Sequence, residues 1–455
     1  MEDSATAACD WIDPFCPLLS DRIGVRPGDP PQPANPAATR TAEALAAFSA
    51  ARTGSVPEAL VDGEAASLED ALAISARLLS GWRQPLFGGL GTDVAGARAL
   101  TRLGIRCGAI LDHVHGEGMT QGLRALQDRG GFTCTLSEVR NRTDLILCIG
   151  CDPTASAPDF FRRCGFGEPV EGAPSERRVI FLRMRDATDD ATATNSAGDS
   201  AIAPLQGMAG VHAEVLNLEG ADLHSVVAEL NAACMGRDLL RAGANWPALQ
   251  RLAGRLKEAR YSTLVHAPAQ LPGRHAALLV EAIGRIVKTL NRASRAGTIA
   301  LGAADGSATV NQTATWLTGL PLRTALHAHG FEHDPHRFGT RRLMRQGAID
   351  GLLWVSSFSP ALLPPTRSGS SLTTVVLAHP AMASAFARGG SGSGGADAET
   401  PRVFIPVSTP GVNAPGQLFR SDGGIVLALK PFATTHLPGV AEVAGRLLRL
   451  LGSGS

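Results

Sequence analysis

The sequence predicts an α/β protein made of several subdomains with mostly parallel sheets. Short β-branched apolar runs alternate with longer segments of helical periodicity through most of the 455 residues, and this alternation is typical of strand–helix–strand units. A chain of this length is too long for one ordinary core, so more than one subdomain is expected. Hydrophobic residues make up 44% of the chain, which is enough to fill a large interior.

The expected strands are short apolar runs bounded by turn-forming residues. They are Gln84–Phe87, Cys107–Leu111, Leu145–Ile149, Val179–Met184, Thr263–His266, Thr298–Leu301, Gly351–Val355, Thr374–Leu377 and Arg402–Ile405.

Segments with apolar residues at every third or fourth position are expected to form helices between these strands. In Ser67–Ser80, Ser67 is placed to cap the helix, and Glu69 and Asp70 fall in its first turn. The other expected helices are Thr92–Leu103, Leu223–Met235, Trp246–Ala259, Arg274–Asn291 and a final helix from Gly439 to about Leu451.

Changes in composition suggest where the chain divides. Residues 26–41 are Pro-rich and predict an extended linker, while residues 186–206 and 388–395 have the composition of exposed loops. We therefore expect an N-terminal region with a Pro-rich linker at 1–66, a first α/β domain at 67–260, a second at 261–390, and a C-terminal segment at 391–455 that returns to the core.

Composition also argues against several classes of protein. The eight cysteines are too sparse for a disulfide scaffold, and the formal net charge of zero argues against nucleic acid as a partner. No apolar run approaches the ~18 residues of a membrane span, and the first residues lack the pattern of a secretory signal. We expect a cytoplasmic protein without a membrane partner.

Histidines provide the candidate metal ligands. His113 and His115 follow an expected strand, and this spacing can supply two ligands of a zinc hydrolase. Further ligands would have to come from His266 at another strand end, or from the loop that holds His327, His329, His333 and His336. The commoner role of such residues is a polar loop or interface position. The zinc hydrolase is therefore one alternative.

Two short motifs are weaker indications. Gly88–Asp93 is a Gly-rich turn between a strand and a helix that could approach a phosphate, but packing of strand against helix explains it equally well. Cys148 and Cys151 form a CxxC whose next residues, Asp152 and Pro153, turn the chain away, which disfavours a thiol switch.

The N-terminal Cys16 stands where an iron–sulfur cluster would need further thiolates. The residues three before and four after it are Asp13 and Ser20, and the nearest other thiol is Cys9. A [4Fe–4S] cluster needs four ligands of this kind. Taken alone, Cys16 is more simply a buried small residue before a turn.

Three segments, taken in order, resemble the B chain of formylmethanofuran dehydrogenase, a molybdopterin oxidoreductase. Residues 16–23 are similar to that family's cluster motif, and residues 136–153 to its central motif. Ile405–Gly411 with Gly416, Arg420 and Asp422 is similar to its closing pattern. The resemblance covers most of the chain and implies a formate-dehydrogenase-like fold.

The departures from that family bear on function. Asp13 and Ser20 replace two cluster cysteines, and Ala95 is the approximate match to the Cys or selenocysteine that ligates the metal. An alanine cannot coordinate molybdenum or tungsten. The resemblance therefore implies a degenerate fold that binds no cofactor itself. An alternative is an active molybdenum or tungsten dehydrogenase with unusual ligands.

This combination resembles the B chains of bacterial formyltransferase/hydrolase complexes of methylotrophs. The resemblance implies a non-catalytic structural subunit in the conversion of formyl-tetrahydromethanopterin to formate through a methanofuran-type carrier. The implied partners are the A, C and D chains of the same complex, of which A is of amidohydrolase type and D is the formyltransferase. The carrier and zinc are expected in these partners. Arg341, Arg342 and Arg345 are candidates for binding carboxylates of the carrier.

Overall fold

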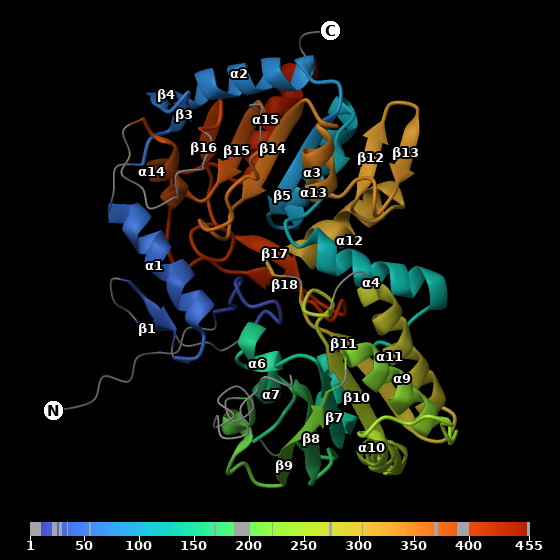
Figure 1. Cartoon of the computed structure of the whole chain (residues 1–455). Coiled ribbons are helices and arrows are strands. Elements are labelled where there is room, and N and C mark those ends of the chain that lie inside the picture. The colour runs from blue at the N-terminus through green and yellow to red at the C-terminus, as the bar shows by residue number, and fades with distance from the viewer. Residues whose placement is uncertain are drawn as a thin grey trace, which may run out of the picture. The chain divides into compact units, whose positions relative to one another are not determined.

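The computed structural model describes residues 11–20, 25–26, 30–33, 35–53, 56–167, 170–185, 201–220, 222–272, 275–302, 304–367, 372–388 and 400–452. The chain forms two compact units (Figure 1). Unit 1 comprises residues 1–117, 303–420 and 425–455, and unit 2 comprises residues 118–302 and 421–424. These limits differ from the four expected segments, because the chain leaves unit 1 after residue 117 and re-enters it at residue 303.

Unit 1 is built on a sheet of nine described strands in the order β13-β12-β6-β5-β14-β15-β16-β3-β4. The five central strands, β6 to β16, are parallel, and the pairs at both edges are antiparallel. The bounds are β3 Ala59–Val61, β4 Glu64–Ala66, β5 Pro85–Gly91, β6 Ile110–Leu111, β12 Thr324–His327, β13 Gly330–His333, β14 Gly351–Ser356, β15 Thr374–Ala378 and β16 Val403–Pro406.

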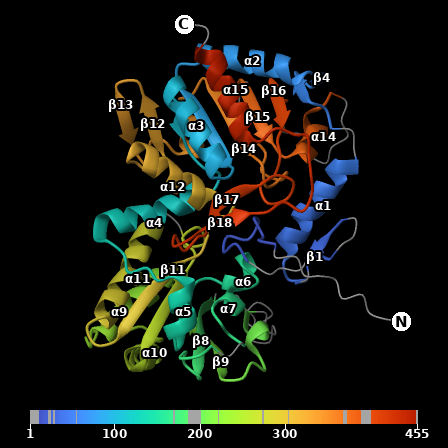
Figure 2. The same cartoon turned by 180° about the vertical axis from the view of Figure 1, so that it is seen from behind.

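Helices cover both faces of this sheet. Figure 2 shows α3 and α15 side by side over one face, where α15 also contacts α2. Side chains of α13 and α14 join the apolar core on strands β5, β14, β15 and β16. The helices of unit 1 are α1 Thr39–Thr53, α2 Leu68–Gly81, α3 Val94–Cys107, α12 Ser307–Thr318, α13 Thr340–Gln346, α14 Ala383–Phe386 and α15 Val440–Gly452.

Unit 2 has a parallel sheet of five described strands in the order β11-β10-β7-β8-β9. Side chains of α9, α10 and α11 pack on it in one large apolar core. The strands are β7 Leu145–Ile149, β8 Arg177–Arg185, β9 Val211–Glu219, β10 Tyr261–His266 and β11 Arg295–Ala300. The helices are α5 Leu136–Arg142, α6 Pro153–Ser156, α7 Phe160–Arg163, α9 Leu223–Cys234, α10 Trp246–Glu258 and α11 Ala276–Leu290, and α4, Gly116–Arg129, begins at the boundary between the units.

Most expected elements are present, with informative differences. The strand expected at Cys107–Leu111 is only β6, because α3 continues to Cys107 and ends at Gly108, whose left-handed backbone closes it. The histidine-rich segment expected to be a loop is the hairpin β12–β13. Pro33 lies in β2 (Gln32–Pro33), which pairs with β1 (Val25–Arg26), and α1 begins inside the expected linker.

Two parts of the expected loops lie outside the described residues, namely 186–200 and 389–395.

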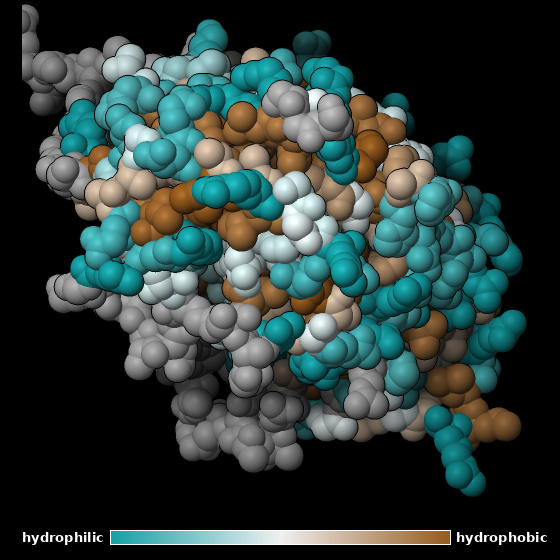
Figure 3. All heavy atoms as spheres, turned by 90° about the horizontal axis from the view of Figure 1, so that it is seen from above, coloured by the Kyte–Doolittle hydropathy of each residue, from teal (hydrophilic) through white to brown (hydrophobic). Residues whose placement is uncertain are grey.

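Figure 3 shows one face of the molecule, on which hydrophobic side chains form separate patches bordered by hydrophilic ones. No helix in the described ranges is both long enough and apolar enough to cross a membrane.

Candidate functional site

The carboxyl ends of the parallel strands in unit 1 place several polar residues along one edge of the sheet. They are Asp93 after β5, His113 after β6, Ser357 after β14, His379 after β15 and Thr409 after β16, and all five are buried. Ligands of open parallel sheets bind outside this edge, because the strand ends and following loops meet there. This edge is therefore the candidate site.

The N-terminal loop, residues 11–20, packs beside this edge. Trp11, Phe15 and Leu19 share one apolar cluster with Phe358 after β14 and Val412 after β16. The Trp11 indole N–H also donates to the carbonyl oxygen of Gly411 at 2.7 Å. The loop is thus held at the site by both apolar contact and hydrogen bonding.

The three residues that stand at expected cluster-ligand positions are bonded within the protein. Asp13 accepts hydrogen bonds from the Thr41 hydroxyl at 2.6 Å and from the Phe15 backbone N–H at 2.9 Å. The Cys16 Sγ lies 3.3 Å from the Ser20 Oγ, within hydrogen-bond distance. The backbone N–H of Asp13 donates to the Ser20 carbonyl at 3.0 Å, which closes the loop.

Burial sets the charge of these groups. It raises the pKa of Asp13 to about 6 and the pKa of the Cys16 thiol to about 11. Cys16 is therefore a thiol at neutral pH, whereas an iron–sulfur cluster is held by thiolates. With one thiol and two oxygen side chains already bonded to their neighbours, the described residues of this loop do not fit a [4Fe–4S] cluster. Cys9 and residues 21–23 of the motif lie outside the described residues.

The first turn of α3, directly after β5, holds the position that the sequence resemblance matched to the metal ligand. Ala95 is exposed in the first turn of α3 and offers only a methyl group. The N-terminus of α3 is capped by Asp93, whose carboxylate accepts the Gly96 N–H at 2.9 Å. The first turn of α3 therefore offers no side-chain ligand for molybdenum at Ala95, and the Asp93 carboxylate already caps the helix end at which an anion would otherwise be stabilised.

His113 and His115 both contact Asp305, which lies just before α12: His113 contacts its backbone carbonyl and His115 its carboxylate. His115 Nε2 is 2.7 Å from one oxygen of Asp305, and Arg40 of α1 donates to the other at 2.6 Å. Burial alone would raise the pKa of Asp305, but the hydrogen bonds from His115 and Arg40 and the Arg40 charge lower it to about 2. Asp305 is therefore ionised at neutral pH.

The ring nitrogens of His113 are both engaged. Nδ1 accepts the His115 backbone N–H at 3.0 Å, so Nε2 carries the proton that it donates to the Asp305 carbonyl at 3.1 Å. Burial, mainly, lowers the pKa of His113 to about 3, so the ring is neutral. A zinc ion could bind His113 only if one of these hydrogen bonds broke.

Within the described residues, the other candidate histidines do not form a metal site with His113 and His115. His266 ends β10 in unit 2, and His327 and His333 lie on the hairpin β12–β13. Among the residues that the structure describes, no group of three or more His, Cys, Asp or Glu side chains is arranged to hold a metal ion.

The CxxC residues are held as thiols. Burial raises the pKa of Cys151 to about 12 and that of Cys148 well above its ordinary value. Cys148 lies in β7, and the Cys151 thiol donates to the Val265 carbonyl at 3.6 Å. The short helix α6 follows at Pro153, capped by Asp152, where the sequence indicated only a turn.

The candidate carrier-binding arginines lie elsewhere in unit 1. Arg341, Arg342 and Arg345 are exposed on α13, while Leu343 and Met344 of the same helix are buried. Arg342 donates to the Gln346 side chain at 3.4 Å. The structure therefore groups these three side chains on one exposed helix surface.

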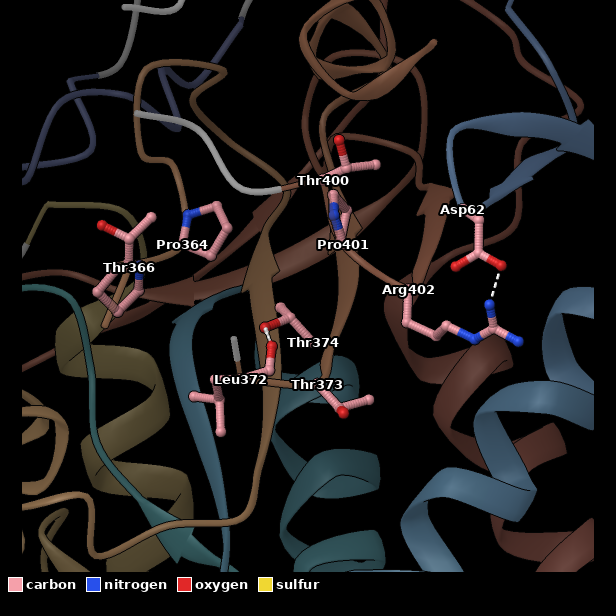
Figure 4. Close-up of a pocket in the computed structure, with 10 residues that line it drawn as sticks. Asp62, Pro364, Thr366, Leu372, Thr373, Thr374, Thr400, Pro401 and Arg402 are labelled. Atoms are coloured by element: carbon pink, nitrogen blue, oxygen red, sulfur yellow. Dashed lines mark hydrogen bonds and ion pairs between the residues drawn. The ribbon is translucent and has the colours of Figure 1, made fainter. Parts of the chain in front are cut away.

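A cavity of about 210 Å³ opens at the opposite edge of the unit 1 sheet, where β15 and β16 begin (Figure 4). Threonine hydroxyls line it, and Arg402 forms an ion pair with Asp62 at its side. None of the site residues predicted from the sequence lines this cavity.

Several residues of the site could not be recognised from the sequence. Asp305 and Arg40 lie 265 positions apart, and neither belongs to a motif. Ser357 and Thr409 complete the edge, since the Ser357 hydroxyl donates to the Gly91 carbonyl and the Thr409 hydroxyl to the Ser357 carbonyl. In the sequence, Ser357 and Thr409 are marked only by their position, because each is a polar residue that follows shortly after an expected strand.

Comparisons with known proteins agree with the order of motifs. No family model matches the chain. It is 28% identical over 399 residues to the B chain of the formyltransferase/hydrolase complex Fhc of Methylorubrum extorquens, covering 86% of this chain and 96% of that protein. It is 23% identical over 366 residues to the B chain of the tungsten-containing formylmethanofuran dehydrogenase 2 of Methanocaldococcus jannaschii, covering 78% and 76% of the two chains.

The fold is similar to a chain in the crystal structure of the formyltransferase/hydrolase complex FhcABCD from Methylorubrum extorquens, determined with methylofuran. The TM-score is 0.68 at 26% identity, covering 87% of this chain and 99% of that chain. In sequence and in fold, the chain is therefore similar over most of its length to the B chain of the formyltransferase/hydrolase complex, as its motifs predicted.

Proposed function

We propose that this chain is a structural, non-catalytic subunit of a cytoplasmic formyltransferase/hydrolase complex. The complex would convert formyl-tetrahydromethanopterin to formate through a methanofuran-type carrier in one-carbon (formaldehyde) oxidation. Similarity to the B chain of an Fhc complex over most of the sequence supports membership of the complex. The structural role is supported by one observation above all: Asp13, Cys16 and Ser20 are buried and satisfied by neighbouring protein atoms.

In this proposal the fold is a degenerate form of the molybdopterin-oxidoreductase fold. The N-terminal loop packs on the carboxyl edge of the unit 1 sheet through apolar side chains and hydrogen bonds that need no cofactor. Formyl transfer and hydrolysis involve no net electron transfer, so a chain without redox ligands is compatible with them. Carrier and zinc would be held by the partners, namely an amidohydrolase-type A chain, a C chain and a formyltransferase D chain.

Isolation of the native complex with a tag on this chain tests the proposal. We expect formyltransferase and hydrolase subunits to co-purify, and metal analysis to find neither molybdenum nor tungsten in stoichiometric amount. Stoichiometric molybdenum or tungsten, or iron–sulfur absorbance, would instead support a dehydrogenase with unusual ligands.

Assay of the isolated chain tests the zinc hydrolase alternative. We expect no formyl hydrolysis by the chain alone. We also expect the complex assembled with His113→Ala to keep its hydrolase rate, provided that the variant folds. Hydrolysis by the isolated chain that His113→Ala abolishes would overturn the structural role.

Resting on this function, we propose that Arg341, Arg342 and Arg345 bind carboxylates of the carrier. Their shared exposure on α13 supports this, because guanidinium groups form charge-assisted hydrogen bonds with carboxylates. Replacement of all three by Gln should weaken retention of the carrier in the complex, whereas the exposed Arg77→Gln on α2 should not. Unchanged retention in the triple variant would remove the carrier site but leave the structural role standing.

A further inference from the structure

The amino-terminal edge of the unit 2 sheet holds an open cavity of about 590 Å³. Its walls come from residues at or just before the starts of the neighbouring strands β11, β10, β7 and β8. Every lining residue belongs to unit 2. Ligands of parallel sheets ordinarily bind at the carboxyl ends of the strands. This cavity lies at the opposite edge, so it is separate from the usual ligand site of such folds.

Three arginines from three different elements line this cavity. Arg142 ends α5, Arg260 directly precedes β10, and Arg295 begins β11. All three are exposed, and within the described chain none of their guanidinium groups has a hydrogen-bond or ion-pair partner. Like charges gathered around one cavity repel each other, and a bound anion relieves that repulsion.

The acidic residues of the cavity do not neutralise these arginines by direct pairing. The two carboxylate oxygens of Asp144 accept the backbone N–H groups of Arg260 and Tyr261 at 2.9 and 3.0 Å. Glu176 is 2.7 Å from the His212 ring nitrogen Nε2. Asp144 therefore holds the start of β10 in place, and the three guanidinium groups remain available to a ligand.

We propose that this cavity binds a small multivalent oxyanion, carrying phosphate groups or several carboxylates. A guanidinium group recognises both by paired N–H···O hydrogen bonds, and three of them favour a ligand with more than one negative charge. The volume is in the range of about 300–1,000 Å³ that is usual for small-molecule sites. The site is independent of the proposed role in the complex, since it rests on residues of unit 2 alone.

Calorimetric titration of the full chain in its complex, at low salt, with pyrophosphate and separately with citrate tests the site. We expect saturable binding of at least one probe. Each single variant Arg142→Gln, Arg260→Gln and Arg295→Gln should weaken it about threefold, and the triple variant about thirtyfold. Tighter binding of pyrophosphate would identify a phosphorylated ligand, and tighter binding of citrate a polycarboxylate.

Arg251→Gln provides the matched control, because Arg251 is an exposed arginine of α10 in the same unit and does not line the cavity. It should leave affinity unchanged. The proposal is wrong if neither probe binds saturably, or if Arg251→Gln weakens binding as much as the single cavity variants do. Should the triple variant not fold, the three single variants decide the question by the same comparison.

Discussion

At the residue scale, the polar side chains of the N-terminal loop, residues 11–20, are packed and hydrogen-bonded within the protein interior. Asp13 and Ser20, which the sequence resemblance matches to cluster cysteines, are both buried with hydrogen-bond partners. Buried polar groups are costly unless they are hydrogen-bonded, so these partners stabilise the folded loop. Asp13 still carries a cost, because burial raises its pKa to about 6.

This cost makes the stability of the protein depend on pH through Asp13. Between pH 4 and 6 the folded state binds the Asp13 proton more tightly than the unfolded chain, so stability falls as pH rises and levels off above pH 6. Asp13→Asn removes this term while its amide can still bond Thr41 and Phe15. We expect the unfolding free energy of the variant, minus that of the native chain, to increase by about 3 kcal/mol as the pH rises through that window.

Denaturant unfolding of both proteins at pH 3.5 and 7.5 measures this difference. Other titrating groups, such as the buried His113, contribute equally to both proteins and cancel in the comparison. Parallel pH profiles for the two proteins would show that Asp13 does not titrate in this way.

A second residue-scale prediction concerns the buried ion pair of Arg323 and Asp112. Arg323 Nε donates to Asp112 at 3.2 Å, and the other carboxylate oxygen accepts from the backbone and side chain of Thr340, at the start of α13. Arg323→Met leaves a buried carboxylate without its cation, so we expect a loss of about 3–5 kcal/mol in unfolding free energy.

The matched control for that variant is Arg337→Met, which breaks an exposed pair with Glu332. Surface pairs contribute about 0–1 kcal/mol, so the control should change stability little. Equal effects of the two variants, measured by chemical denaturation, would contradict the importance assigned to burial.

At the element scale, the glycine-rich segment that the sequence indicated as a turn is, at residues 88–91, the end of strand β5, and it depends on close backbone approach. Gly89 has a φ of +72°, and a Cβ there would lie 2.6 Å from the Val355 carbonyl oxygen on the neighbouring strand. The glycine-rich sequence of this part of β5 is thus explained by the contact between β5 and β14. Asp93 then begins α3 by capping it.

Gly89→Ala should therefore destabilise the fold by about 2 kcal/mol or more, because crowding and backbone strain add. Gly254→Ala is the control, since Gly254 lies inside α10 with open space around its Cα. It should stabilise the protein by about 0.5–1 kcal/mol through helix propensity. Thermal and denaturant unfolding of the two variants should give shifts of opposite sign, and shifts of the same sign would contradict this account.

At the scale of the whole molecule, unit 2 is an almost continuous insertion into unit 1. It has its own parallel sheet and its own large apolar core. Only residues 421–424 come from elsewhere in the chain, and Asp422 accepts the Leu136 N–H at the start of α5. Each unit therefore has the core that an independently folding domain needs.

We expect a fragment of residues 118–302 to fold on its own. Its loss of Asp422 removes the hydrogen bond to the Leu136 N–H, with a cost of about 1 kcal/mol that is small beside the apolar core. Circular dichroism should show α/β content and a cooperative thermal transition. A fragment that shows no cooperative transition would mean that unit 2 needs unit 1 in order to fold.

Much of the fold follows from local sequence pattern. The strand at Leu145–Ile149 and the Ser67 cap of α2 are present as predicted, because periodicity and capping are local properties. The hairpin β12–β13 and the edge strand β9 were not predicted. The side chains of β13 and β9 are mostly exposed or partly buried, and β12, although mostly buried, has only four residues, so these strands carry little apolar signal.

Residue type and spacing alone were enough to predict the α/β class and the order of motifs, and they place Asp13, Ser20 and Ala95 at positions where the resembling family has metal or cluster ligands. The folded chain was needed to see that Arg40 and His115 both contact Asp305, and that Arg142, Arg260 and Arg295 line one cavity. The physical reason is that these contacts arise from strand order and chain return between segments far apart in sequence, which no local pattern encodes.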